Sequence, residues 1–280
     1  MSAQLEPLRR QIAPRVYPSR RGEADGAVVF ASGKGGTGTS TLAALLAVGA
    51  AARGSRVLLV DGNVGFGSLH LYLGVGAGAG WAALKAGAPA EDLLVKVTET
   101  LTLLPAGSAE DAAAASISAA ERAALFRKVS SLYAAYDLVV VDGGSRLDSV
   151  LAACGAGVGR LVAVSTPDRV SLAGTYALVK VLDGKLSGLP VSVVVNRGDE
   201  TAAESLRGAA RRFLARSVDC AGAVPDDECL RAGINAGMDI QDAAVDSPAA
   251  AAILEAGTHF VRGLRAGSAA GETLQLSRRS

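Results

Sequence analysis

Short runs of aliphatic and β-branched residues alternate along the chain with longer stretches whose apolar residues recur at helical spacing. The runs that predict strands lie at 27–31, 56–60, 101–104, 137–141, 161–165 and 191–195. The stretches that predict helices lie at 40–52, 118–135, 171–186, 202–215 and 248–265. Apolar strands that alternate with helices are typical of a parallel sheet buried on both faces. We therefore predict an α/β fold of three layers, in which a mostly parallel sheet is flanked by helices.

Local signals at the ends of segments support this division of the chain. Ser118 and Glu121 have the spacing of a capping box at the start of a helix. The uncharged segment 62–84 is interrupted by glycines and carries Asn63 and His70, which predicts a loop and a short helix rather than a membrane span. We expect one domain at 26–265, preceded by a mobile segment at 1–25 and followed by a polar tail at 266–280.

Charge and cysteine content narrow the classes of function. The formal net charge is +1, from 28 Lys and Arg against 27 Asp and Glu, so no overall field favours nucleic acid or an anionic membrane. Cys154, Cys220 and Cys229 show no CxxC spacing, and we interpret them as buried or idle thiols in a reducing compartment. The first residues mix arginine with proline and lack the apolar stretch of a signal peptide, which predicts a cytoplasmic protein.

A glycine-rich loop follows the first predicted strand and leads directly into an alanine-rich helix. Residues 32–41 read SGKGGTGTST. Glycines let the backbone turn and aim successive N–H groups at one point, and the following helix presents its positive end to an anion. The pattern GxxxxGK[ST] fits from Gly33 to Ser40, except that Thr39 replaces the lysine. We interpret the segment as a phosphate-binding loop; the alternative is a glycine-rich turn without a ligand.

This loop resembles the deviant Walker A motif, KGGxGK[ST], of the MinD/ParA family of P-loop ATPases, which belong to the SIMIBI class. In that family the early lysine, here Lys34, reaches across a nucleotide-sandwich homodimer to the partner's phosphates. The lysine that Thr39 replaces supplies charge to the β- and γ-phosphates, and such a charge-assisted hydrogen bond is worth about 1.5–3 kcal/mol. The resemblance implies that ATP or ADP is held by Gly33, Lys34, Gly35, Gly36, Thr37, Gly38, Thr39, Ser40 and Thr41.

Two acidic residues lie at the ends of predicted strands. Asp61 follows the second strand and Asp142 follows the run 138–141, and strand ends of open α/β sheets face the ligand crevice. The resemblance implies that both aspartates hold Mg²⁺ through water and that Ser40 is the direct ligand. Gly143 and Gly144 would then form a switch loop that moves with the γ-phosphate. The alternative for Asp61 is that it only caps the next helix.

Asn63 lies where the family carries a second aspartate, which orients or activates the attacking water. An amide cannot act as a base near neutral pH. Of the three catalytic positions that the resemblance implies, Lys34 is retained, whereas Thr39 and Asn63 are degenerate. Two independent losses in one reaction predict slow or absent ATP hydrolysis.

Two later segments, 193–197 and 223–227, resemble the family segments that flank the adenine. Asn196 would bond to the base edge and Pro225 would pack on its face, with Arg197 and Asp226 beside them. The alternative is an ordinary strand end and an ordinary turn.

From about residue 26 to 264, the order of these segments resembles the FlhG group of flagellar regulators, also called FleN or YlxH. FlhG-type proteins carry an N-terminal segment that stimulates the GTPase FlhF, and Gln4, Leu8 and Arg9 keep its spacing, although a disordered tail is the alternative. The resemblance implies three partners: a second copy of the chain, an FlhF-like GTPase and flagellar switch-complex proteins. The C-terminal segment offers little apolar surface, so we expect weak or no association with the inner face of the plasma membrane.

Three functions are compatible with this pattern. The leading hypothesis is an ATP-binding dimerisation switch that regulates flagellar number or placement, with weakened or lost hydrolysis. A scaffold that no longer binds nucleotide is the second, and an active ParA-type ATPase that partitions DNA is the third. The third needs a basic surface, for which a solvated helix face is the simpler explanation of the candidate residues. Those candidates are Arg207, Arg211, Arg212 and Arg216.

Overall fold

The computed structural model of the chain describes residues 27–64, 67–108, 110, 116–186, 188–213 and 218–258. The predicted N-terminal segment and the polar tail lie outside these residues, and so do Gln4, Leu8 and Arg9. Within the described part of the chain, no helix is long and apolar enough to cross a membrane.

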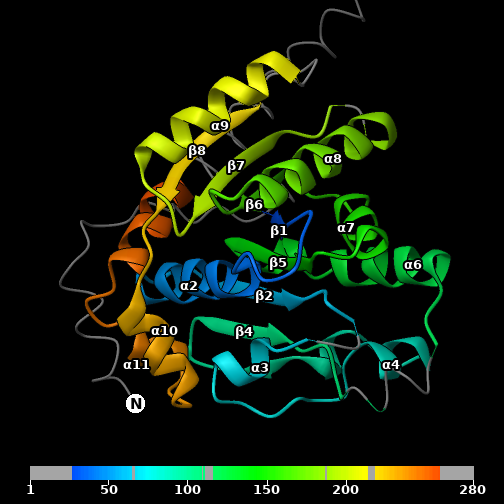
Figure 1. Cartoon of the computed structure of the whole chain (residues 1–280). Coiled ribbons are helices and arrows are strands. Elements are labelled where there is room, and N and C mark those ends of the chain that lie inside the picture. Colours follow the sequence, from blue (N-terminus) through cyan, green and yellow to red (C-terminus); the bar gives the residue numbers. More distant parts are fainter. Residues whose placement is uncertain are drawn as a thin grey trace, which may run out of the picture.

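The centre of the molecule is an eight-stranded sheet with the strand order β3-β4-β2-β5-β1-β6-β7-β8 (Figure 1). The bounds are β1 Ala27–Ala31, β2 Val57–Asp61, β3 Val95–Lys96, β4 Leu101–Leu104, β5 Leu138–Gly144, β6 Arg160–Ser165, β7 Val191–Asn196 and β8 Asp219–Val224. Neighbouring strands are parallel, except that β3 and β4 are antiparallel. Because the parallel strands share one direction, the loops after their carboxyl ends gather along one edge of the sheet.

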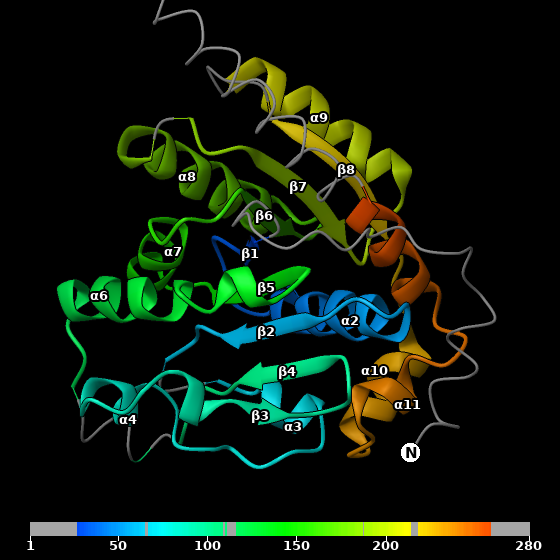
Figure 2. The same ribbon diagram turned by 180° about the vertical axis from the view of Figure 1, so that it is seen from behind.

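Helices cover both faces of this sheet (Figures 1 and 2). Their bounds are α2 Thr39–Ala52, α3 Leu69–Tyr72, α4 Gly80–Lys85, α6 Ala119–Ser130, α7 Leu147–Cys154, α8 Arg169–Lys185, α9 Glu200–Phe213, α10 Glu228–Asn235 and α11 Ile240–Ala243. Residues 248–258 are also helical. Short 3-10 turns lie at Glu91–Leu93 and Tyr133–Ala135.

Two apolar cores form because successive side chains of a strand point to opposite faces. In β1, Val28 and Phe30 join one core, whereas Ala27, Val29 and Ala31 join the other. The first core contains α2, α3, α10, α11 and the helical residues 248–258. The second contains α4, α6, α7, α8 and α9. The predicted three-layer fold is therefore confirmed.

All six predicted strands are present, and the capping box of Ser118 and Glu121 begins α6. The predicted helix 118–135 is wrong in its extent, because α6 ends at Ser130 and a 3-10 turn follows. The sequence prediction missed β3, β8, α7, α10 and α11, and it gave one short helix in 62–84 where α3 and α4 both lie. The sequence of β8, DCAGAV, has only one β-branched residue, so it lacks the pattern by which the other strands were identified.

The only tryptophan of the sequence, Trp81, connects α4 to the centre of the sheet. Trp81 of α4 is buried against Phe126 of α6, with 4.5 Å between ring centroids. Its indole N–H donates to the main-chain oxygen of Asp61 at 2.7 Å. The emission of Trp81 is therefore placed to report on changes at the end of β2.

Candidate functional site

The glycine-rich loop joins β1 to α2 at the carboxyl edge of the sheet. Gly36 and Gly38 have φ of 79° and 87°, a left-handed conformation that glycine adopts without strain. Gly38 immediately precedes α2, so the loop ends at the positive end of a helix of 14 residues. A Cβ atom at Gly38 would overlap the amide of Asn196. The backbone therefore has the turn and the helix end that an anion-binding loop requires.

The two positions at which the family pattern places lysines differ in their surroundings. Thr39, the first residue of α2, is buried, and its hydroxyl lies 2.9 Å from that of Thr37. Lys34 is half-exposed, and its ammonium lies 3.4 Å from a carboxylate oxygen of Asp168. The Thr166 hydroxyl and the Ser171 N–H, with Lys34, hold the pKa of Asp168 at about 2. The ammonium of Lys34 thus pairs with the carboxylate of Asp168, which immediately precedes α8.

Asp61 and Asp142 lie side by side, because β2 and β5 are neighbours and these residues are in register. Both are buried. Burial, reinforced by the charge of Asp142, raises the pKa of Asp61 to about 7. Burial also raises the pKa of Asp142, although hydrogen bonds from the Ser40 hydroxyl and the Gly144 N–H oppose the shift.

A magnesium ion fits this donor set. Mg²⁺ prefers oxygen ligands and is bound in nucleotide sites by one or two carboxylates together with phosphates. Two adjacent buried carboxyl groups lack a compensating cation among the described residues, and a divalent ion would favour their charged forms. The structure thus brings together Ser40, Asp61 and Asp142, the three residues that the sequence assigned to the metal.

Asp61 also has a structural role. Its carboxylate accepts hydrogen bonds from the N–H groups of Asn63 at 3.2 Å and Leu69 at 3.0 Å. The second of these bonds fixes the start of α3, so the capping interpretation and the metal interpretation both describe this residue. The side chain of Asn63 lies beside Gly144, where a Cβ atom would be 3.2 Å from the amide. Asn63 therefore contacts the segment that the sequence predicts to be a switch.

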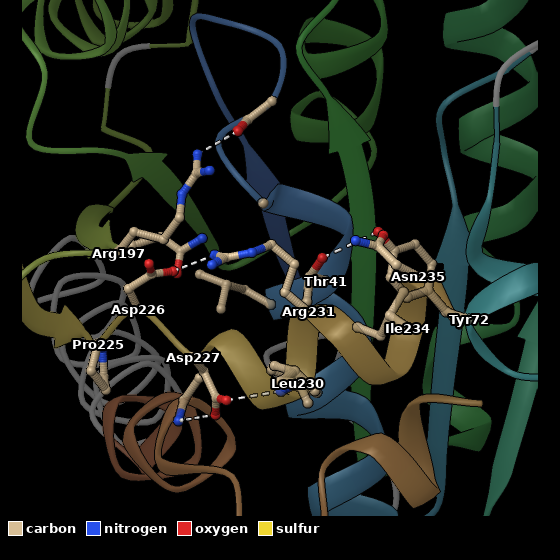
Figure 3. Close-up of a pocket in the computed structure, with 16 residues that line it drawn as sticks. Thr41, Tyr72, Arg197, Pro225, Asp226, Asp227, Leu230, Arg231, Ile234 and Asn235 are labelled. Carbon is tan, nitrogen blue, oxygen red and sulfur yellow. Dashed lines mark hydrogen bonds and ion pairs between the residues drawn. The ribbon is translucent and has the colours of Figure 1, made fainter. Parts of the chain in front are cut away.

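A cavity of about 160 Å³ lies between the glycine-rich loop and α10 (Figure 3). Asn196, Arg197, Pro225 and Asp226, which the sequence assigned to the nucleotide, all line it. So do Gly36, Gly38, Thr41, Leu42, Leu45, Tyr72, Asp227, Leu230, Arg231, Ile234, Asn235 and Ala249. The cavity is thus continuous with the loop, as one site for a base and its phosphates requires.

Three of the predicted nucleotide-binding residues, Asn196, Arg197 and Asp226, contact the protein itself in this structure. The amide of Asn196 donates to the main-chain oxygen of Thr37 at 2.8 Å. The guanidinium of Arg197 donates to the main-chain oxygen of Gly36 at 2.6 Å. Asp226 pairs with Arg231 at 2.6 Å. The end of β7 therefore holds the glycine-rich loop by two consecutive carbonyls.

The sequence prediction missed the contribution of α10 to the site. Asp227 caps this helix by accepting from the N–H of Leu230 at 2.9 Å, and it also accepts from the hydroxyl of Ser247. The signal for this helix is Asp227 followed by an apolar residue three positions later. With α10 placed, Arg231 and Ile234 would have been candidates for the cavity wall.

The predicted idle cysteines differ in exposure. Cys154 is buried, Cys220 is half-buried and Cys229 is exposed, and the three are unpaired. Among the described residues, no group of three or more His, Cys, Asp or Glu side chains is placed to hold a metal. The candidate cation site therefore depends on two carboxylates and a hydroxyl.

Known proteins with similar sequences or structures include ATP-binding proteins and regulators of site selection in the cell. An uncharacterized ATP-binding protein of Methanocaldococcus jannaschii is 29% identical over 82% of this chain and 85% of its own length. The flagellum site-determining protein YlxH of Helicobacter pylori is 29% identical over 55% of this chain and 52% of its own length. The structure of the septum site-determining protein MinD of Pyrococcus horikoshii, complexed with Mg-ADP, is similar with a TM-score of 0.68 and 25% identity. That likeness covers 82% of this chain and 93% of that chain.

The sheet order, the glycine-rich loop before α2 and the acidic pair on β2 and β5 define a P-loop ATPase fold of the MinD/ParA kind. A sequence model of the family described as cellulose biosynthesis protein BcsQ matches residues 27–173, which is more than half of the chain. The chain therefore belongs to the BcsQ family within the MinD/ParA P-loop ATPases.

Proposed function

We propose that the protein is an ATP-binding dimerisation switch that resembles FlhG and regulates the number or placement of flagella. The observation that carries the proposal is the cavity joined to the glycine-rich loop and to the acidic pair Asp61 and Asp142. A role in flagellar placement is supported by the similarity to YlxH, whose name describes flagellum site determination. In this proposal ATP and Mg²⁺ bind together, and the bound state differs from the free state in its association with a second copy.

We further propose that hydrolysis is slow or absent. Thr39 has no charge to offer the phosphates, and its hydroxyl is directed to Thr37. Asn63 lies beside Gly144 and has no basic group at neutral pH. The missing cation weakens stabilisation of the negative charge that develops during phosphoryl transfer, and the missing carboxylate leaves the attacking water without a group that orients or activates it.

Calorimetric titration with ATP and Mg²⁺ tests the binding step. Saturable heat is expected, and it would exclude the scaffold that binds no nucleotide, which the uncharged Thr39 otherwise favours. A titration without heat at several temperatures, together with an unchanged Trp81 emission spectrum, would contradict the proposal. The preference for an adenine base is tested by the same titration, in which the affinities for ATP and CTP are compared.

A gain of function tests the hydrolytic defect. The double variant Thr39→Lys/Asn63→Asp restores both missing groups, and we expect steady-state phosphate release to rise by about 10²-fold or more over the natural chain. Either substitution alone is expected to restore less, because the two groups act on one step. Robust release by the unaltered protein would overturn this part of the proposal. Asp142→Asn in the double variant is the control for a contaminating ATPase.

One observation supports a different biological role for the switch. The matched family is described by cellulose biosynthesis, so a role in the assembly of a cellulose-synthesising machinery is the second candidate. Deletion of the gene distinguishes the two roles. Altered number or position of flagella supports the flagellar role, whereas altered cellulose with normal flagella supports the role in cellulose synthesis.

The predicted activation of an FlhF-like GTPase depends on Gln4, Leu8 and Arg9. GTP turnover measured with a peptide of residues 1–25 tests this activation.

A ParA-type role in DNA partitioning is tested by retention of DNA on the protein in the presence of ATP. Arg207 of α9, one of the candidates for this contact, pairs with Glu200 of the same helix at 3.6 Å. Both side chains are solvent-exposed, as expected of charged residues on a solvated helix face. We therefore expect no salt-dependent retention of DNA, and retention that falls steeply with salt would favour the ParA role.

A further inference from the structure

The phosphate loop has lost a positive charge, and the structure shows which nearby cation is free to replace it. Three cationic side chains of the described residues contact the loop or line the cavity: Lys34, Arg197 and Arg231. Lys34 is paired with Asp168 beside α8. Arg231 is paired with Asp226 at 2.6 Å, at the end of the cavity formed by the loop after β8. Each of these two charges is opposed by a carboxylate.

Arg197 has a different environment. Its guanidinium donates to the main-chain oxygen of Gly36, a neutral acceptor inside the glycine-rich loop. Figure 3 shows Arg197 pointing from the end of β7 toward this loop, whereas Arg231 turns toward Asp226. A guanidinium has five N–H donors, and this bond uses one of them. The charge of Arg197 is therefore held beside the loop. The remaining N–H groups of its guanidinium are available to donate to a phosphate oxygen.

The backbone at Arg197 supports a functional placement. Its φ of 55° lies in the left-handed region, which a non-glycine residue adopts at a cost and where its surroundings fix it. The preceding residue, Asn196, is buried and bonds to the main-chain oxygen of Thr37. This bond anchors the end of β7 and directs the next side chain across the loop to Gly36.

We propose that Arg197 supplies to the nucleotide phosphates the positive charge that Thr39 no longer provides. The inference rests on the proposed nucleotide binding and adds to it the residue that compensates the substitution in the loop. The guanidinium acts through its own charge and its remaining N–H donors, and the bond to Gly36 keeps it beside the phosphates. In this arrangement one cation at the end of β7 replaces another at the start of α2.

Replacement of Arg197 distinguishes this role from a purely structural tether. Arg197→Gln removes the charge. It also removes the bond to Gly36, because the glutamine amide nitrogen lies two bonds short of the terminal guanidinium nitrogen that donates to Gly36. We expect the affinity for ATP with Mg²⁺ to fall by about tenfold or more, because a charge-assisted hydrogen bond is lost, whereas the affinity for AMP changes by less than about threefold. A tether alone would alter both affinities alike. Arg197→Lys keeps the charge and is expected to retain most of the preference for ATP.

Thr39→Lys provides the decisive second variant, because it returns a cation to the loop itself. In the Thr39→Lys background, Arg197→Gln is expected to reduce ATP affinity by less than about threefold, since the two cations serve the same phosphates. Equal losses in both backgrounds would overturn the inference. Arg127→Gln on α6 is the matched control, because this exposed arginine on another element loses the same charge.

The outcomes separate the inference from the proposed function. If the natural chain shows no saturable binding of ATP by calorimetry, the proposed function fails. If the natural chain binds ATP and Arg197→Gln binds ATP and AMP with unchanged affinities, the inference alone fails. Thermal unfolding of each variant shows whether it is folded, and a variant that unfolds at the temperature of the titration is replaced by Arg197→Met.

Discussion

Asp61 and Asp142 face each other from neighbouring strands, and their burial makes the folded chain prefer a proton at this position. A carboxyl group whose folded pKa is raised stabilises the fold below its ordinary pKa, and that stability is lost as the pH rises through the folded value. For Asp61 this window extends from 3.8 to about 7. The arrangement therefore costs stability near neutral pH, which is a common property of sites that bind a cation.

Asp142→Asn tests this cost. The substitution removes one of two adjacent charges and keeps an oxygen that accepts from the N–H of Gly144. In EDTA at pH 7.5, we expect the variant to be more stable than the natural chain by about 0.5–2 kcal/mol. The difference should shrink at pH 5, where the natural pair holds its proton. Thermal unfolding at the two pH values measures both effects.

The same variant should lose the effect of Mg²⁺ on ATP affinity, because one of the two carboxylates that hold the cation is absent. Asp92→Asn, an exposed aspartate in the 3-10 turn at Glu91–Leu93, is the control. An unchanged Mg²⁺ dependence in Asp142→Asn would remove Asp142 from the proposed metal site.

At the scale of elements, the glycine-rich loop is positioned by α8 as well as by the end of β7. Gly33 lies so close to the backbone of Gly174 that a Cβ atom on Gly33 would overlap the main-chain oxygen of Gly174. The contact occurs between a loop and the interior of a helix that are far apart in sequence. The loop and α8 are therefore in direct backbone contact.

Gly33→Ala is expected to destabilise the fold by about 1–3 kcal/mol or more, because the backbone of α8 must move to admit the methyl group. Gly184→Ala in the same helix is the matched control, since open space surrounds that position. A helical glycine replaced by alanine is expected to gain about 0.5–1 kcal/mol. Urea unfolding of both variants measures the two signs, and a neutral Gly33→Ala would show that the loop and α8 are less tightly packed.

The start of α6 depends on the capping box of Ser118 and Glu121, in which the side chain of each residue bonds to the backbone of the other. The hydrogen bond from the Ser118 hydroxyl is the main cause that lowers the pKa of Glu121 to about 2. A lowered carboxyl pKa stabilises the fold above its ordinary value, and this stability is lost as the pH falls from 4.5 toward about 2.

Ser118→Ala removes the N-cap hydroxyl and is expected to cost about 1 kcal/mol at pH 7. The cost is expected to be smaller at pH 3. Ser131→Ala, which follows the other end of α6, is the control for loss of a hydroxyl. Thermal unfolding at the two pH values checks the prediction. A cost that does not change with pH would show that the side chain of Glu121 contributes nothing to the cap.

Elements with strong local patterns were predictable, and those defined by tertiary contacts were not. The strands in the middle of the sheet are continuous apolar runs, so their burial on both faces is visible in the sequence. By contrast, β8 is an edge strand of weak composition, and α10 is a single amphipathic helix of eight residues that packs on α11. The cavity needed α10, which is why Arg231 was missed while Asn196 and Pro225 were found.

The same limit applies within the loop. The sequence showed that Thr39 lacks a charge, but not which cation from another part of the chain contacts the loop. Arg197 is distant from Gly36 in sequence, and only the parallel arrangement of β1, β6 and β7 brings the two together. Long-range placement of this kind follows from the strand order, which local patterns do not specify.

At the scale of the whole molecule, exposed apolar residues accompany the candidate site. Val170 near the start of α8 is 66% exposed, and Leu147 at the start of α7 is 42% exposed. Both helices begin just after the carboxyl ends of strands, so these side chains belong to the edge of the sheet that carries the phosphate loop. Asp168, the partner of Lys34, precedes Val170 by two positions. In a dimer across the nucleotide this edge would face its copy.

Val170→Arg places a charge on this edge, at a residue that does not line the cavity. We expect the monomer to bind ATP with unchanged affinity, while the ATP-dependent dimer is lost, because a buried unpaired charge costs several kcal/mol at an interface. Val245→Arg is the matched control, since this exposed valine follows α11, a helix that packs against α2 on the other face of the sheet. Sedimentation with ATP, with ADP and without nucleotide measures the outcome. If Val170→Arg dimerises with ATP as well as the natural chain does, association uses a surface other than the edge beside Lys34.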